Sequence, residues 1–193
     1  MRLTALTALA LLASATLAPL AAQADRTPPT VVVLGGPDEG RRAPDFTLPW
    51  ATKDTIGPAY QPFGLWKTAG KTVVLAFYPR DFTPGCTSEM RTFADQYETL
   101  FGPDVVVVGI SADSLATHQR FAASLSLPFM LLSDPDQRVA ALYASKDKGG
   151  YNRRTVFVIG RDGRVRFRNM TFRPLDPKDY DELKRAVQRA RRG

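Results

Sequence analysis

One segment, residues 73–90, constrains the fold of this chain more than any other. It opens with VVLAF, an apolar run with two β-branched valines, which predicts a buried β-strand. A turn containing proline and glycine follows, and from Met90 to Leu100 apolar residues recur as they do on one face of a single helix. Counting back one turn from Met90 places Cys86 on the same inward face. The sequence therefore predicts a cysteine in the first turn of a helix that follows a buried strand.

A cysteine in this position suggests nucleophilic chemistry. The thiolate is the reactive form, whereas most of a free cysteine is protonated at neutral pH. A helix N-terminus favours the anion by only about 0.3 to 1 kcal/mol at an exposed site. A charge-assisted hydrogen bond from an arginine supplies roughly 1.5 to 3 kcal/mol more. We therefore expect an arginine from elsewhere in the fold to lie against Cys86.

The rest of the chain alternates between predicted strands and helices. Residues 104–111, which are rich in valine, and residues 129–134 predict two further buried strands, each followed by apolar residues at helical spacing. Residues 155–170 predict two strands joined by a tight Asp-Gly turn, and a helix capped by Asp176 begins at Pro177. This order predicts an α/β fold in which a central mixed β-sheet is flanked by helices on both faces.

The N-terminal residues have the pattern of an export signal. Residues 1–24 contain Arg2, an apolar run rich in alanine and leucine, and an A-x-A sequence ending at Ala24, which predicts a signal peptide cleaved after Ala24. An uncleaved membrane anchor is the alternative, but threonines and serines within the run favour cleavage. We expect a periplasmic or secreted protein without stable membrane association, in which residues 25–42 form a linker and residues 43–193 form one domain.

Charge and cysteine content exclude several functions. The net charge is +7, but the arginine pairs are scattered and no aromatic residues interleave with them, so nucleic-acid binding is not expected. One cysteine permits no internal disulfide. One cysteine and one histidine cannot supply the four ligands of a structural zinc site. The single thiol therefore needs another explanation, either as a reactive group or as an inert buried residue.

The spacing of this cysteine and two residues before it resembles that of a known family. Pro79, Thr83 and Cys86 stand at the P-x-x-x-T-x-x-C spacing of the peroxiredoxins of the AhpC/TSA family. FYPRDFTPGCTSE is similar to the bacterioferritin comigratory protein subfamily, and APDFTL and SADSLATHQRFAASLSLPFMLLSDPDQRVAALY agree with it. The resemblance covers residues 43 to about 170. It implies a thioredoxin-like fold and a thiol-dependent peroxidase that uses no metal, haem, flavin or other cofactor.

The resemblance also implies roles for five residues. Cys86 matches the peroxidatic cysteine, which attacks the peroxide O–O bond and becomes a sulfenic acid. Thr83 matches a hydroxyl that bonds thiolate and peroxide, and Pro79 a ring that shields the pocket from water. Arg154 matches the arginine that bonds the thiolate and the peroxide oxygens, and Glu89 an acid that orients it. From the residues alone, Thr83 and Glu89 could instead be a helix cap and an ordinary first-turn acid.

Two other positions qualify this reading. The subfamily commonly carries a resolving cysteine five residues after the first, and Arg91 stands there instead. The resemblance therefore implies a one-cysteine peroxiredoxin, whose sulfenic acid is reduced by an external thiol: a small thiol, or a thioredoxin-like or glutaredoxin-like protein. His118 lies among apolar residues on a predicted helix face, so we expect a packed, hydrogen-bonded histidine.

The substrates that the resemblance implies are hydrogen peroxide and small organic hydroperoxides, with the protein acting as a monomer or homodimer. The missing resolving cysteine leaves a second hypothesis open. The chain could be a peroxide sensor or redox-dependent binding protein of the same fold without efficient turnover. A thiol–disulfide oxidoreductase would need a C-x-x-C pair, and Thr83 stands where its first cysteine would be.

Overall fold

The computed structural model describes residues 35–193. The predicted signal peptide, residues 1–24, lies outside the described residues, and so do residues 25–34 of the predicted linker. Within the part that is described, none of the helices is both long enough and apolar enough to cross a membrane.

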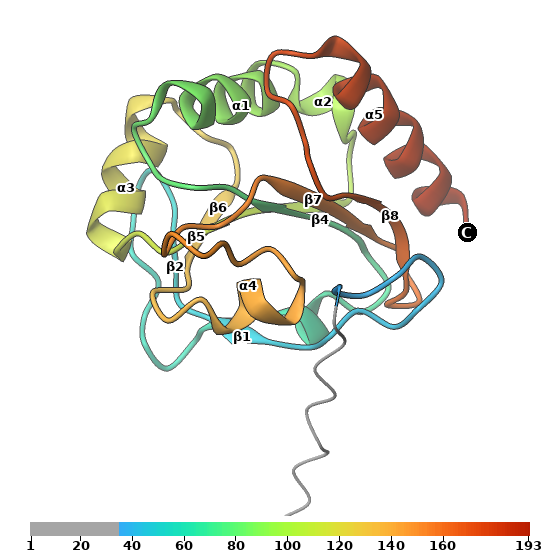
Figure 1. Ribbon diagram of the computed structural model, residues 1–193, viewed down its shortest axis with the longest axis horizontal. Coiled ribbons are helices and arrows are strands. Elements are labelled where there is room, and N and C mark those ends of the chain that lie inside the picture. The colour runs from blue at the N-terminus through green and yellow to red at the C-terminus, as the bar shows by residue number, and fades with distance from the viewer. Residues whose placement is uncertain (1–34) are drawn as a thin grey trace, which may run out of the picture. The chain divides into compact units, whose positions relative to one another are not determined.

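A six-stranded mixed β-sheet runs through the domain (Figure 1). The strand order is β2-β6-β5-β4-β7-β8, with β4, β5 and β6 parallel and the other neighbouring pairs antiparallel. The strands are β2 (Trp50–Ala51), β4 (Thr72–Phe77), β5 (Val105–Ser111), β6 (Met130–Ser133), β7 (Thr155–Ile159) and β8 (Val165–Asn169). A separate ribbon pairs β1 (Thr47–Leu48) with β3 (Phe63–Gly64). The mixed sheet predicted from the sequence is confirmed.

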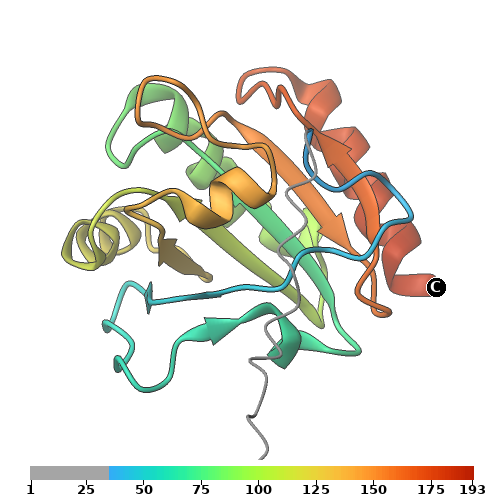
Figure 2. The same cartoon turned by 60° about the horizontal axis from the view of Figure 1, so that its bottom comes forward.

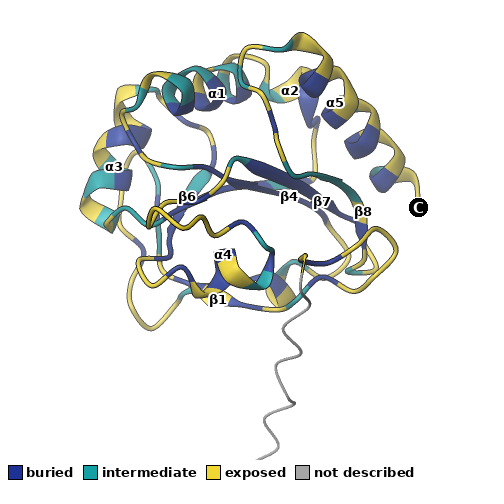
Figure 3. Cartoon of the chain, viewed as in Figure 1, coloured by how far each residue is buried: buried dark blue, intermediate teal, exposed yellow. Residues whose placement is uncertain are grey.

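Helices cover both faces of this sheet, as the sequence predicts. One face is covered by α1 (Pro84–Asp95), α2 (Tyr97–Leu100) and α5 (Pro177–Arg192), and α3 (Leu115–Ser124) adds apolar residues to the same core. The other face is covered by α4 (Arg138–Leu142), the short 3-10 helix η1 (Leu65–Thr68) and the β1–β3 ribbon, which Figure 2 brings forward. Each helix turns its buried side to the sheet and its exposed side outward (Figure 3).

The central strand β4 divides the core into two clusters. All six of its residues are buried, because β5 and β7 pair with its two edges and helices cover its two faces. Successive side chains point to opposite faces of a strand. Val74 and Ala76 accordingly join the cluster under α1 and α5, whereas Val73 and Leu75 join the cluster beside α4. This strand ends at the segment that carries the cysteine.

The prediction of a single helix from the cysteine to Leu100 is wrong. The helix ends at Asp95, and α2 begins at Tyr97 after Gln96, whose φ of −109° and ψ of 20° leave the helical region. The change of direction lets the ring of Tyr97 stack on Phe129, with ring centroids 6.2 Å apart. Aromatic packing against the strand layer thus accompanies the break in the helical run.

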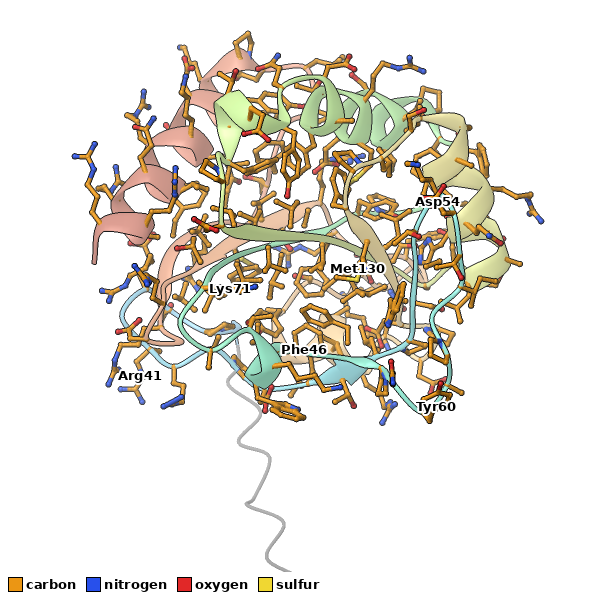
Figure 4. The ribbon with its side chains drawn as sticks, turned by 180° about the vertical axis from the view of Figure 1, so that it is seen from behind. Arg41, Phe46, Asp54, Tyr60, Lys71 and Met130 are labelled. Atoms are coloured by element: carbon orange, nitrogen blue, oxygen red, sulfur yellow. The ribbon has the colours of Figure 1, made fainter. Side chains whose placement is uncertain are left out.

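Residues 51–70 connect β2 to β4 by way of β3 and η1. Phe63 is buried and pairs with Leu48, whereas Trp66 is 60% exposed. Figure 4 shows Tyr60 at the outer end of this segment and Phe46 in the interior of the domain. Phe63 and Leu65 of this segment belong to the core cluster beside α4, whereas Cys86 belongs to the cluster on the other face of the sheet.

The described end of the predicted linker pairs with the final hairpin. The N–H of Gly40 donates to the carbonyl of Val165 over 2.8 Å, and the N–H of Val165 donates to the carbonyl of Arg41 over 2.9 Å. The hairpin itself turns at Gly163, whose φ of 76° suits glycine, as the Asp-Gly signal predicts. The division of the chain between residues 42 and 43 stays a prediction.

Candidate active site

The cysteine lies where the sequence predicts it. The loop after β4 leads to Thr83, whose extended backbone (φ −85°, ψ 148°) precedes the first helical residue, Pro84. A proline is favoured there because the first N–H groups of a helix have no intrahelical acceptor. Cys86 follows in the first turn and is fully buried, in contact with the core beneath α1. The thiol thus sits at the positive end of the α1 dipole, which favours an anion.

The arginine that the chemistry requires comes from the segment before β7. Because β7 runs antiparallel to β4 with Thr155 opposite Phe77, the residue before Thr155 lies beside the loop that leaves β4. Nη2 of Arg154 donates to Sγ of Cys86 over 3.3 Å. The neighbouring Arg153 is exposed, and its Nη2 lies 3.5 Å from the carbonyl of Met170. The structure thus brings Arg154, and not Arg153, to the cysteine.

A buried carboxylate holds the other side of the guanidinium. Nη1 of Arg154 donates to Oε2 of Glu89, which lies on α1 and has no exposed side-chain surface. Burial raises the pKa of Glu89 to about 7, although the charge of Arg154 opposes the shift. Burial lowers the pKa of Arg154, but the charges of Glu89 and Cys86 outweigh it and raise that pKa. The guanidinium therefore stays charged and fixed between the carboxyl group and the sulfur.

Thr83 and Pro79 lie in the segment that leads from β4 to Cys86, and both are half-buried. The hydroxyl of Thr83 donates to the carbonyl of Arg80 over 3.0 Å. Among the described residues it makes no hydrogen bond to Cys86, and it does not cap α1 through its side chain. Its lone pairs therefore remain available to a donor that enters the pocket. The roles of these two residues, like those of Cys86, Arg154 and Glu89, stay predictions.

Asn152 is a residue of this region that the sequence analysis missed. Its side chain is buried, donates to the carbonyl of Ile110 over 3.0 Å and accepts from Gln137 over 2.9 Å. The same Ile110 carbonyl accepts from the N–H of Tyr78 over 3.1 Å. The carbonyl oxygen of Ile110 on β5 thus bonds both Tyr78, at the start of the loop that leads to Cys86, and Asn152, in the segment that leads to Arg154. The only sequence signal was a polar residue just before a predicted strand.

Comparisons with known proteins agree with this geometry. Residues 40–168 match the AhpC/TSA family. The chain is 35% identical over 133 residues to Peroxiredoxin Bcp of Bacillus subtilis, covering 65% of this chain and 80% of that protein. It is 38% identical over 153 residues to the chloroplastic Peroxiredoxin Q of Sedum lineare, covering 78% and 77%.

A solved structure shows the same fold. Peroxidoxin BcpB of Mycobacterium tuberculosis superposes with a TM-score of 0.67 at 28% identity, over 79% of this chain and 97% of that one. The fold is therefore thioredoxin-like, as the resemblance implies. The site it carries, a thiol at a helix N-terminus within hydrogen-bond distance of an arginine, is the site of a thiol-based enzyme. The chain belongs to the AhpC/TSA family, that of the peroxiredoxins.

Proposed function

We propose that this chain is a thiol-dependent peroxidase that reduces hydrogen peroxide and small organic hydroperoxides through Cys86. Family membership supports this reaction. The observation that carries it is the guanidinium of Arg154, 3.3 Å from the cysteine sulfur in the first turn of α1. A cationic donor and a helix N-terminus both favour the thiolate, which is the nucleophile that the reaction needs.

Oxidation transfers one oxygen atom to the sulfur. The Cys86 thiolate attacks the terminal peroxide oxygen, so the S–O bond forms as the O–O bond breaks. The sulfur loses two electrons, and the departing oxygen takes up a proton to leave as water or an alcohol. The product on the enzyme is a sulfenic acid.

Four neighbours assist this step. Arg154 donates to the sulfur and to the developing charge on the peroxide oxygens, and Glu89 orients the guanidinium. Because the Thr83 hydroxyl already donates to Arg80, its oxygen accepts a hydrogen bond from the peroxide O–H. Pro79 keeps water from the thiolate on the loop side.

Reduction needs a thiol from outside the chain, because the sequence contains one cysteine. A first thiol attacks the sulfenic sulfur, forms a mixed disulfide and releases water. A second thiol attacks that disulfide, restores Cys86 and leaves as the oxidised reductant. A small thiol, or a thioredoxin-like or glutaredoxin-like protein, acts as the donor, and the enzyme works as a monomer or homodimer.

Rapid-quench mass spectrometry tests the proposal. The mature protein is mixed with one equivalent of hydrogen peroxide and a dimedone-type trap, and sampled at times below one second. We expect a rapid adduct on Cys86 and multiple turnovers once a thiol is added, with both lost in Cys86→Ser. Peroxidase activity retained by Cys86→Ser would overturn the proposal.

The same experiment addresses the competing hypothesis. Arg91 stands where a resolving cysteine would be, and this favours a sensor or redox-dependent binding protein as a second candidate. A sensor would form a persistent mixed disulfide with a partner and show no sustained turnover with a simple thiol. Rapid repeated turnover would exclude it.

We also propose that the protein acts in the periplasm or outside the cell, after cleavage of its signal peptide following Ala24. Support comes from the charge and apolar pattern of residues 1–24 and from the A-x-A sequence. The N-terminal sequence and cell fraction of the expressed protein test it. A mature protein that retains Met1 and stays with the cytoplasmic fraction would contradict it.

A further inference from the structure

A buried polar cluster includes the middle residue of the loop from Pro79 to Thr83. The carboxylate of Asp81 is at its centre, and Asp81 is 3% exposed. The hydroxyl of Tyr78 donates to Oδ1 of Asp81 over 2.6 Å, and Nδ1 of His118 lies 2.8 Å from Oδ2. Tyr78 and His118 have no exposed surface. Buried polar groups are costly unless they are paired, so such a complete set has a structural purpose.

The hydrogen-bond pattern fixes the role of one ring nitrogen of His118, Nε2, as a donor. Its Nε2 lies 3.1 Å from the carbonyl oxygen of Leu132, which can only accept, so Nε2 carries a hydrogen. Its Nδ1 faces a carboxylate oxygen, and one proton lies between them. Burial and the charge of Asp81 raise the pKa of Tyr78, so the tyrosine keeps its proton for the same carboxylate. The carboxylate of Asp81 is thus held by Tyr78, which directly follows β4, and by His118 on α3.

The backbone of Asp81 is fixed as well. Its N–H donates to Oδ2 of Asp113 over 2.9 Å, and the hydroxyl of Ser111 donates to the same oxygen over 2.7 Å. The next residue, Phe82, has a φ of 58°, which is uncommon for a residue with a side chain, and its ring packs on Phe121 with centroids 5.0 Å apart. The loop therefore keeps an unusual backbone conformation because its neighbours hold it there.

Helix α3 makes two of these contacts: His118 with Asp81, and Phe121 with Phe82. His118 and Phe121 lie one turn apart on α3, and this helix lies beside the loop that joins β4 to α1 (Figure 1). Asp81 lies two residues after Pro79 and two before Thr83. A shift of Asp81 would consequently move both residues predicted to face the peroxide.

We propose that His118 is a positioning residue for the peroxidase reaction, which acts through Asp81 to hold the loop from Pro79 to Thr83 in place over Cys86. The inference rests on the proposed function, since it concerns the same site. His118 lies on the far side of Asp81 and acts without touching peroxide. Its loss slows oxidation of the sulfur by misplacing Thr83 and Pro79, while Arg154 and Glu89 keep their contacts with Cys86 and with each other.

Two matched substitutions of His118 test the proposal. In His118→Asn the amide nitrogen stands near the position of Nδ1 and still donates to Asp81, but the bond to Leu132 is lost. In His118→Gln the amide nitrogen stands near the position of Nε2, so the bond to Leu132 is kept and the bond to Asp81 is lost. Each variant removes one buried hydrogen bond, so similar losses of thermal stability are expected.

The two variants are expected to differ in the rate of sulfenate formation. In rapid quench with hydrogen peroxide, His118→Gln is expected to fall about tenfold or more and His118→Asn about threefold or less, because only the former frees Asp81. Alkylation of Cys86 by iodoacetamide, which does not need the peroxide-shaped pocket, is expected to change less than about threefold in both. Equal loss of peroxide reactivity in the two variants, or parallel changes in peroxide and iodoacetamide rates, would overturn the proposal.

A second pair covers the case in which substitutions of His118 fail to fold. Asp81→Asn can accept from Tyr78 and donate to an imidazole protonated only at Nε2, so the network stays complete and the peroxide rate is largely kept. Asp81→Ala leaves both partners unsatisfied and is expected to lose at least about tenfold. Equal rates in these two variants would contradict the proposal. A wild-type protein that forms no rapid sulfenate would instead refute the proposed function itself.

Discussion

Arg154 donates a hydrogen bond to the sulfur of Cys86 over 3.3 Å although 68 positions separate the two residues in the chain. Strand pairing creates this contact, because β7 is antiparallel to β4 and the residue that precedes β7 meets the loop that follows β4. The side chain of Asn152, two residues before Arg154, donates in turn to the carbonyl of Ile110 on β5. The cation is therefore placed by the sheet rather than by a mobile surface segment.

Removing this cation gives the first prediction. Arg154→Ala is expected to lower the second-order rate constant for Cys86 oxidation about ten- to hundredfold, because a hydrogen bond to a charged group is worth about 1.5 to 3 kcal/mol. Arg153→Ala is the matched control, since this neighbouring arginine is exposed and does not reach the sulfur. Stopped-flow or rapid-quench kinetics with hydrogen peroxide measures both. Similar losses in the two variants would point to general surface charge instead of the specific contact.

Glu89 gives a pH dependence of stability. Its pKa rises from the ordinary value of 4.5 to about 7, because burial penalises the carboxylate. A folded-state pKa above the unfolded value stabilises the fold below pH 4.5, and this contribution is lost as the pH rises towards 7. The free energy of unfolding of the wild type, relative to Glu89→Gln, is therefore expected to fall between these two pH values.

Urea unfolding of both proteins across that window measures the difference directly. Other titrating groups cancel because they are common to the two chains. A difference that stays constant with pH, or that rises, would show that the attraction of Arg154 outweighs the burial of the carboxylate.

A substitution at Gly85 is expected to affect the thermal stability and the rate of peroxide reduction differently. A Cβ added there would lie 3.3 Å from Nη2 of Arg154 and 3.8 Å from Cγ of Pro174. Alanine is favoured over glycine in a helix by about 1 kcal/mol. The contact with Arg154 is tight, so the guanidinium has to move by a few tenths of an ångström, and this is expected to disturb its 3.3 Å hydrogen bond to the sulfur of Cys86.

Gly85→Ala is accordingly expected to keep or slightly raise the melting temperature while the rate of peroxide reduction falls about three- to tenfold. Thermal unfolding measures the melting temperature, and rapid-quench kinetics on the same preparation measures the rate of peroxide reduction. An unchanged rate would mean that Arg154 accommodates the methyl group without leaving the sulfur.

The sequence predicts the sheet, the buried strands and the cysteine in the first helical turn because these follow from local periodicity and from a proline at a helix start. Arg154 could be predicted from strand parity together with the family resemblance. The break at Gln96 could not, since apolar spacing continues through it and the reason for the turn is a ring on Phe129. The hydrogen bond from the Thr83 hydroxyl to the carbonyl of Arg80 could not be predicted from the sequence either.

The supporting polar contacts were missed for a related reason. Asp81 and His118 are 37 positions apart, and Asn152 reaches a carbonyl 42 positions away. Periodicity reports which side of an element is buried but not which polar group it meets there. His118 was predicted to be packed and hydrogen-bonded, and this is confirmed, but its partner in the cysteine loop became apparent only in the folded chain.

The last prediction concerns the fate of the oxidised sulfur. Cys86 is the one cysteine of the sequence, and Arg91, at the position of the usual resolving cysteine, is exposed on α1. After one equivalent of hydrogen peroxide and no thiol, intact mass is expected to show one added oxygen atom. Addition of a small monothiol is expected to replace this species by a mixed disulfide and then by the reduced protein.

Because Cys86 is fully buried in the reduced protein, the first turn of α1 has to open before a thiol reaches its sulfur. We therefore expect the mixed disulfide to form more slowly with a bulky monothiol than with a compact one of equal acidity, while the peroxide step is the same for both. Arg91→Ala serves as the control and is expected to leave both rates unchanged. A covalent dimer that forms through Cys86 without added thiol would show instead that a second copy of the chain acts as the resolving partner.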